Sequence, residues 1–173
     1  MFVSTIENFK YIIVDSPNEE WSNIRKILTT ATRMSEYSGN NIYRPAESRI
    51  FQRIEHIHHK EPMNEFMKKG IEKEPIILNE CCKKNDIKLE SSPLMINPLN
   101  SRYGATADGL GIFKKDLKPI TLEAKHTVNK NENPDIQYII QCITQMKLWN
   151  LKESLLIYNT HFGYRKTYKI KKG

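Results

Sequence analysis

The stretch RYGATADGLGIFKKDLKPITLEAKHT, residues 102–127, holds two acidic residues and one lysine that fit no core pattern. Its second half predicts a strand, and alternate side chains of a strand share a face, so Glu123 and Lys125 project together. Asp108 ends an earlier short strand, and a hairpin between the two strands would bring its carboxylate beside Glu123. The sequence therefore predicts that two carboxylates and one ammonium group meet at one point.

Two interpretations of this face stay open on the strand pattern alone. A carboxylate beside an ammonium group can be a surface ion pair, which contributes little to stability. Two converging carboxylates instead favour a bound cation, and oxygen ligands suit Mg²⁺, with Mn²⁺ as the alternative. Such an ion polarises a phosphoryl oxygen, while Lys125 can position a water and offset charge in the transition state.

Length and composition predict one globular domain spanning residues 1–173. No apolar run approaches the ~20 residues that cross a bilayer, and no signal peptide is predicted. We therefore expect a cytoplasmic protein without membrane contact, or a phage or viral protein inside its host cell. The net charge of +7 favours a polyanionic partner such as DNA.

Cysteine and histidine usage does not support a disulfide or zinc framework. The three cysteines form no CxxC pair, and two of them are adjacent. The segment His56-Ile57-His58-His59 has no second Cys/His pair at a metal-ligand spacing, so exposed histidines at a helix end are favoured over a zinc site.

The order of the elements predicts an α/β (α+β) fold, in which an N-terminal helical part precedes a mixed central sheet flanked by helices. A helix is expected from Ser16 as N-cap to Leu28, with a turn or short helix from Thr30 to Gly39. Residues 61–84 are expected as two helical pieces broken near Gly70 and Pro75, and Asn85 as a left-handed stop. Further helices are expected over 45–58 and from Asn133, and strands over 87–98, 103–113, 118–126, 154–158 and 164–170.

Four blocks of the sequence resemble one known family. GATADGLG and ITLEAKHT (residues 104–111 and 120–127) are similar to the GATPDGL and LEIKCP blocks of the YqaJ-like viral recombinases, the group that contains phage lambda exonuclease. MKKGIEKEP (67–75), WSNIR with TAT (21–25 and 30–32) and YIIQCITQM (138–146) resemble further blocks in the same order. The resemblance implies the restriction-endonuclease-like core of the PD-(D/E)xK nuclease superfamily.

The resemblance also implies roles for individual residues. It makes Asp108, Glu123 and the backbone carbonyl of Ala124 the metal ligands, with Lys125 serving the nucleophilic water. It places an acidic residue that holds a second metal or a water at Glu74, for which Glu72 is the neighbouring alternative. It implies that Gln141 orients Lys125 or the water, although a glutamine on a helix could equally bond a carbonyl group. Arg25 and Thr32, with Thr30 beside them, are implied to bind a 5′-phosphate.

Three departures from the family pattern leave these side-chain functions in place. Ala107 replaces a proline, His126-Thr127 replaces Cys-Pro, and Thr32 replaces a serine but keeps the hydroxyl group. We therefore expect a Mg²⁺-dependent nuclease, and first of all a 5′-to-3′ exonuclease on double-stranded DNA ends in recombination or replication. The alternatives are an endonuclease or RNA-cleaving nuclease of the same fold, and a non-catalytic DNA-binding module. Besides double-stranded DNA, a single-strand annealing protein is a candidate partner, and the protein is a candidate homo-oligomer.

Overall fold

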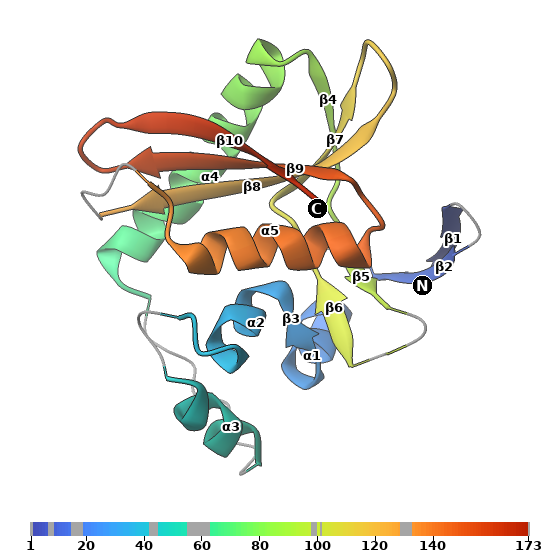
Figure 1. Ribbon diagram of the computed structural model, residues 1–173, viewed down its shortest axis with the longest axis vertical. Helices are drawn as coiled ribbons and strands as arrows, with labels where there is room; N and C mark the ends of the chain where they lie inside the picture. Colours follow the sequence, from blue (N-terminus) through green and yellow to red (C-terminus); the bar gives the residue numbers. More distant parts are fainter. Residues whose placement is uncertain are drawn as a thin grey trace.

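Two mixed sheets form the frame of the protein in this computed structural model (Figure 1). The structure describes residues 2–6, 9–14, 19–41, 45–54, 63–97, 100, 102–128 and 133–172. One sheet has the strand order β10-β9-β8-β7-β4, and the other has the order β1-β2-β5-β6-β3. Each sheet is antiparallel apart from one parallel pair, which is β8 with β9 in the first and β3 with β6 in the second.

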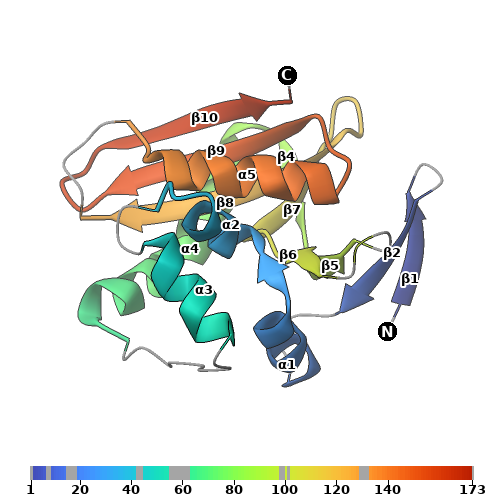
Figure 2. The same cartoon turned by 60° about the horizontal axis from the view of Figure 1, so that its bottom comes forward.

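The larger strands build the first sheet, and one helix covers each of its faces. Its strands are β4 (Ile87–Glu90), β7 (Gly109–Phe113), β8 (Pro119–Thr127), β9 (Glu153–Thr160) and β10 (Arg165–Lys171). The two covering helices are α4 (Glu65–Lys84) and α5 (Ile136–Leu148). Figures 1 and 2 show the two helices on opposite sides of this sheet. The long α5 connection lets β8 and β9 run parallel, as such a pair requires.

The second sheet lies beside the first, and short helices accompany it. Its strands are β1 (Phe2–Ile6), β2 (Phe9–Val14), β3 (Thr29–Thr30), β5 (Leu94–Ile96) and β6 (Tyr103–Ala105). The remaining helices are α1 (Glu19–Ile27), α2 (Ala31–Tyr37) and α3 (Ala46–Ile54). In Figure 1, α2 lies next to α5 on the side away from the first sheet. The segment from β3 to α2 therefore reaches the same helix that covers β8.

Strand β8 is buried on both faces. Its Ile120, Leu122 and Ala124 side chains pack with the apolar residues of α4 and β9 in one core cluster. The opposite face, which carries Thr121 and Glu123, is also shielded from solvent. The interpretation of this face as a solvated surface ion pair is therefore wrong, and an ionisable side chain there must be paired inside the protein.

Two of the predicted strands are each divided between the two sheets. Residues 87–98 form β4 in the first sheet and β5 in the second, and residues 103–113 form β6 in the second and β7 in the first. Pro93 lies in the first break, where a residue without an N–H group cannot continue a ladder. The second break, residues 106–108, carries the chain back into the first sheet immediately before β7.

Other boundaries also differ from the expectations. Helix α4 is continuous through Gly70 and Pro75, because its second half packs apolar side chains on the sheet and this packing outweighs the local penalty of proline. The left-handed residue is Asp86 rather than Asn85, which keeps a negative φ. The chain starts with the strands β1 and β2, so the helical part does not come first.

The other expected elements are found close to their predicted places. Helix α5 begins after Asp135, and β8, β9 and β10 match the last three predicted strands within a few residues. The predicted helix start at Ser16 and the residues 55–58 of the predicted second helix lie outside the described residues, as does the histidine segment 56–59.

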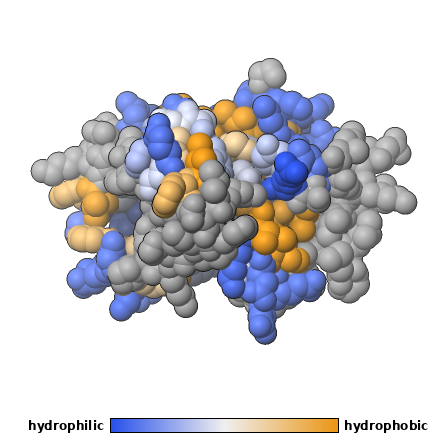
Figure 3. Space-filling view, turned by 90° about the horizontal axis from the view of Figure 1, so that it is seen from below, coloured by the Kyte–Doolittle hydropathy of each residue, from blue (hydrophilic) through white to orange (hydrophobic). Residues whose placement is uncertain are grey.

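The described helices include none that is both long and apolar enough to span a bilayer. Figure 3, which views the molecule from below Figure 1, shows apolar patches lying between hydrophilic side chains on that face.

Candidate active site

Asp108 lies at the start of β7, opposite the middle of β8. The antiparallel register pairs Gly109 with Leu122 and Leu110 with Thr121, so Asp108, the residue immediately before β7, lies opposite Glu123. The Asp108 Oδ2 atom accepts a hydrogen bond of 2.8 Å from the backbone N–H of Ala124. The predicted approach of Asp108 to the Glu123 segment is confirmed, and a single hydrogen bond fixes it.

The Glu123 carboxylate is completely buried and receives hydrogen bonds from three side chains. Lys125 and Gln141 both donate to its Oε1 atom. Gln145 donates to its Oε2 atom over 2.6 Å. Both glutamines belong to α5, where a spacing of four residues places them on one face of the helix. A buried charge requires such partners, so α5 is the element that makes an ionised Glu123 tolerable.

The charges in this site act strongly on one another. Burial and the nearby Asp108 raise the pKa of Glu123 to about 7, although Lys125 opposes the shift. Burial by itself lowers the pKa of Lys125, but the carboxylates of Glu123 and Asp108 outweigh it and raise that pKa. The Lys125 side chain is 23% exposed and its Nζ lies 4.0 Å from Asp108 Oδ2. Lys125 is therefore a charged donor at the mouth of the site.

Glu74 faces the same site from α4. Burial and Asp108 raise the pKa of its carboxyl group to about 7, while Lys125 acts in the opposite direction. Glu72, the neighbouring alternative, is exposed. The structure thus brings Glu74, and not Glu72, into the electrostatic environment of the two strand residues.

The oxygen atoms of the site fit a divalent cation that keeps much of its water. In the described part of the chain, no three His, Cys, Asp or Glu side chains come close enough together to hold a metal ion. Asp108 and Glu123 supply two carboxylates, and Mg²⁺ is usually bound through one or two. Burial first, and then the charge of Asp108, raises the pKa values of Glu123 and Glu74, while Lys125 lowers both. A cation at this place would favour the ionised carboxylates.

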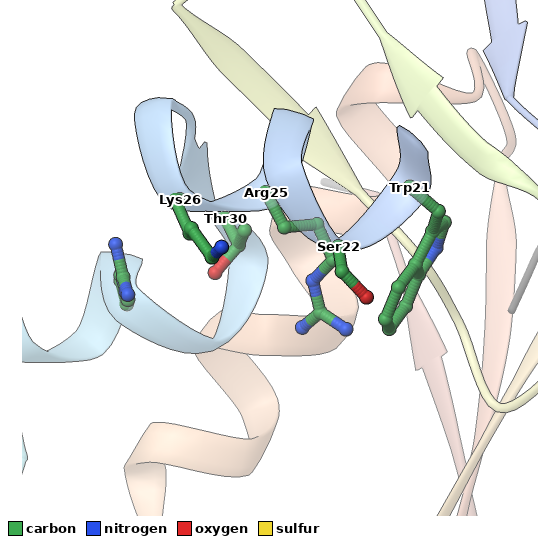
Figure 4. Close-up of a pocket in the computed structure, with 6 residues that line it drawn as sticks. Trp21, Ser22, Arg25, Lys26 and Thr30 are labelled. Carbon is green, nitrogen blue, oxygen red and sulfur yellow. The ribbon is translucent and has the colours of Figure 1, made fainter. Parts of the chain in front are cut away.

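A cavity of ≈ 230 Å³ opens beside α1 and the start of α2. It is lined by Trp21, Ser22, Arg25, Lys26, Thr30 and Arg33 (Figure 4). The Arg25 guanidinium lies over the Trp21 ring, 4.3 Å from its centre. Burial and the neighbouring Arg33 lower the pKa of Arg25, whereas Asp108 and Glu123 raise it. The cavity is thus rich in positive charge and within electrostatic range of the carboxylates.

The structure brings only part of the predicted phosphate-binding group together. Arg25 and Thr30 line the cavity, but the exposed Thr32, in the first turn of α2, is not among its lining residues. Arg33, which the family resemblance did not point to, also lines the cavity. Arg33 lies three residues after Thr30, the N-cap of α2. Residues three apart lie on the same side of a helix, so both side chains face the cavity.

Two more residues of the site were missed. Gln145 belongs to the block YIIQCITQM (138–146) and follows Gln141 by four residues. This spacing places both glutamines on one face of a helix and could have identified Gln145. Thr106 accepts hydrogen bonds from Gln145 and from Trp21, and no sequence pattern pointed to it. Gln141 itself donates directly to the Glu123 carboxylate, and among the described residues its side chain forms no hydrogen bond with a backbone carbonyl or with Lys125.

Residues 20–150 match the family model described as the YqaJ-like viral recombinase domain. The chain belongs to this family. None of the curated protein sequences matches the chain.

Solved structures share the fold of this YqaJ-family protein. An alkaline exonuclease from Laribacter hongkongensis is 20% identical, with a TM-score of 0.68 over 90% of this chain and 83% of that chain. The same exonuclease in complex with dAMP is 22% identical, with a TM-score of 0.69 over the same shares. A phage-related exonuclease from Haemophilus somnus is 13% identical, with a TM-score of 0.55 over 94% of this chain and 86% of that chain. The restriction-endonuclease-like arrangement expected from the sequence agrees with the mixed sheets and flanking helices of these exonucleases.

Proposed function

We propose that this YqaJ-family protein is a Mg²⁺-dependent DNA nuclease, and specifically a 5′-to-3′ exonuclease on double-stranded ends. The observation that carries the proposal is the convergence of Asp108, Glu123 and Lys125 where β7 meets β8. Family membership and the fold shared with two exonucleases support the same conclusion. In this proposal the protein acts in recombination or replication, and a single-strand annealing protein is a candidate partner.

Asp108, Glu123 and the backbone carbonyl of Ala124 are the proposed ligands of Mg²⁺, for which Mn²⁺ can substitute. When bound, such an ion polarises a phosphoryl oxygen and lowers the pKa of its water. The hydrogen bonds from Gln141 and Gln145 hold the Glu123 carboxylate in one orientation. Because these donors belong to a packed helix, the carboxylate needs little rearrangement before substrate binds.

Lys125 and Glu74 are the proposed proton-handling and charge-compensating groups. Lys125 remains protonated and donates a hydrogen bond toward the scissile phosphate or the attacking water. The water oxygen bonds to phosphorus as the bond to the 3′ oxygen breaks. The attacking water gives up a proton, and the leaving 3′ oxygen takes up a proton from solvent to become a hydroxyl group. Glu74 is suited to hold that water or accept its proton, since its pKa of about 7 lies near neutral pH.

The cavity beside Arg25 supplies the proposed preference for 5′ ends. A guanidinium group binds phosphate in bidentate fashion, and Lys26 and Arg33 add further positive charge. A terminal phosphate in this cavity would place the following phosphodiester nearer the carboxylates, whose charges reach Arg25. The exonuclease from Laribacter hongkongensis that shares the fold has been crystallised with the nucleotide dAMP, which agrees with a nucleotide-binding site in such a fold.

The catalytic proposal is tested by following an end-labelled DNA duplex with Mg²⁺, with Mn²⁺ and with EDTA. We expect digestion only with a divalent ion, and a loss of about 10²–10³-fold in rate for Lys125→Met because a charged donor to the reacting groups is removed. Lys118→Met is the control, since this exposed lysine pairs with Asp116 away from the site. Digestion that persists in EDTA, or full activity of the Lys125 variant, would contradict the mechanism.

The type of nuclease is tested with substrates that differ in their ends. A 5′-phosphorylated duplex, a 5′-hydroxyl duplex, a closed circular duplex and a structured RNA are compared under the same conditions. An exonuclease degrades the first fastest and leaves the circle intact. Cleavage of the circle would indicate an endonuclease, cleavage of the RNA an RNA-cleaving enzyme, and binding without any cleavage a non-catalytic DNA-binding module.

A further inference from the structure

Gln145 contacts both the Glu123 carboxylate and the segment that precedes Asp108. Its Nε2 atom donates to Glu123 Oε2 over 2.6 Å and to the backbone carbonyl of Thr106 over 3.3 Å. The side chain is fully buried. A single amide group therefore joins β8 to the break between β6 and β7.

The contacts continue from Thr106 to the cavity. The Thr106 hydroxyl accepts a hydrogen bond of 3.3 Å from the indole Nε1 of Trp21, and the Arg25 guanidinium lies over the same indole ring. In Figure 4, the Trp21 and Arg25 side chains extend from α1 in the same direction. An unbroken series of contacts thus runs from Glu123 through Gln145, Thr106 and Trp21 to Arg25.

The orientation of the Gln145 amide is determined by its surroundings. Its Oε1 atom is buried and has no hydrogen-bond partner among the described residues. If the amide were turned over, this oxygen would face the Glu123 carboxylate and the Thr106 carbonyl, both of which are acceptors. The Gln145 amide therefore keeps both hydrogen bonds of its Nε2 atom, although its Oε1 atom then has no partner among the described residues. The two Nε2 bonds thus define the orientation of the side chain.

Gln141 provides an internal comparison. It belongs to the same helix and donates to the same carboxylate, at Oε1. No hydrogen bond connects it to Thr106 in the described part of the chain. Both glutamines therefore hold the Glu123 carboxylate, but only Gln145 also bonds Thr106 among the described residues, which connects it to the cavity.

We propose that Gln145 is a positioning residue that, through Thr106 and Trp21, fixes the place of Glu123 relative to Arg25. A terminal phosphate bound in the cavity is thereby held in register with the carboxylate that serves the scissile bond. The inference rests on the proposed nuclease function and adds a residue that selects for phosphorylated ends without touching the phosphate.

The test compares Gln145→Met with Gln141→Met, since methionine has nearly the volume of glutamine but lacks the amide. Rates are measured at saturating concentrations of 5′-phosphorylated and 5′-hydroxyl duplexes. We expect Gln141→Met to slow both reactions by the same factor, so that the ratio between the two ends is unchanged. We expect Gln145→Met to lower this ratio about fivefold or more, a typical lower value for coupling between two sites. Equal loss on both ends in Gln145→Met would show that it only holds Glu123.

A second variant tests the other end of the contact series without altering the core. Trp21→Phe keeps an aromatic ring under Arg25 and removes the N–H group that bonds Thr106. It should lower the same ratio, and combining it with Gln145→Met should produce little further loss, because both changes break one connection. Fully multiplicative effects would contradict a shared connection. Melting temperatures identify a variant that fails to fold, and Trp21→Phe then still decides the question.

A binding measurement separates this inference from the nuclease proposal. In EDTA, fluorescence anisotropy gives the affinity of each variant for the two labelled duplexes. Wild-type protein that binds the phosphorylated duplex more tightly in EDTA, but cleaves neither duplex once Mg²⁺ or Mn²⁺ is supplied, would contradict the nuclease proposal. A lower binding preference in Gln145→Met alone would still support the connection. Equal affinity of the wild-type protein for both duplexes, or an unchanged preference in Gln145→Met, would overturn it.

Discussion

At the scale of single residues, the side chain that shapes the site most is Glu123, whose carboxylate has no exposure to solvent. An unpaired buried charge is costly, and here one lysine and two glutamines share the cost as hydrogen-bond donors. Burial, together with the charge of Asp108, nevertheless raises the pKa values of Glu123 and Glu74. The metal-free protein should therefore be sensitive to pH.

Glu74 offers a measurable form of this sensitivity. Its pKa is raised from 4.5 to about 7 on folding, so the folded protein holds a proton that the unfolded chain releases in this range. The stabilising effect is complete below the unfolded value and is lost as pH rises through the folded value. In EDTA, the free energy of unfolding should fall from about pH 5 to about pH 8, and less so in Glu74→Gln.

Glu72→Gln is the matched control for this measurement, because Glu72 is exposed two residues away on the same helix. Urea unfolding at several pH values compares the three proteins, and Glu123 leaves part of the decline in all of them. If Glu74→Gln followed the wild-type curve, the Glu74 carboxyl group would not have the environment described.

Arg25 is the residue on which the preference for phosphorylated ends should depend most. Arg25→Ala should slow digestion of a 5′-phosphorylated duplex and remove its advantage over a 5′-hydroxyl duplex, by about tenfold or more for a charged hydrogen bond pair. Arg165→Ala is a suitable control, since this arginine pairs with Glu80 on the other side of the sheet. Full phosphate preference in Arg25→Ala would show that the arginine is ordinary surface charge, and would favour an endonuclease.

At the scale of elements, close approach of strands limits which glycines can be replaced. A Cβ atom at Gly104 of β6 would lie 2.7 Å from Leu28 Cδ1 and 3.1 Å from the Met95 carbonyl oxygen. Gly104→Ala should thus destabilise the protein by about 1–3 kcal/mol. Gly70 in α4 has no atom within 4 Å of such a Cβ, so Gly70→Ala should stabilise by about 0.5–1 kcal/mol. Urea unfolding midpoints measure both, and equal effects would contradict the packing of β6.

The element scale also shows how far the sequence could predict this structure. The alternation of Glu123 and Lys125 and the turn after Phe113 are local, and local patterns correctly placed Asp108 beside β8. The assignment of β5 and β6 to the other sheet depends on pairing with β2 and β3, which lie far away in the sequence. Periodicity contains no information about such partners, so neither the division of the strands nor the cavity below α1 could be predicted from it.

At the scale of the whole molecule, the net charge of +7 favours DNA, and the cavity gathers three of the positive side chains. If Arg25, Lys26 and Arg33 each neutralise one phosphate, affinity for duplex DNA should fall about fortyfold between roughly 50 and 200 mM salt. Arg25→Ala should reduce the slope of log affinity against log salt by about 0.9. Fluorescence anisotropy in EDTA measures both slopes, and a slope that the variant leaves unchanged would exclude Arg25 from the phosphate contacts.

The hydrogen bond from the Ala124 N–H to Asp108 continues the pairing of β7 and β8 by one more contact, made by a side chain in place of the backbone. Asp108 consequently has a structural role in aligning the two strands beside its proposed chemical role. A descendant of this protein that lost its activity could still retain the aspartate to keep the two strands aligned. The Lys125 side chain lies at the mouth of the site and does not help to pair β7 with β8. When activity in relatives is judged from their sequences, a missing lysine should be the earlier sign of decay, and an intact aspartate is weak evidence of a working enzyme.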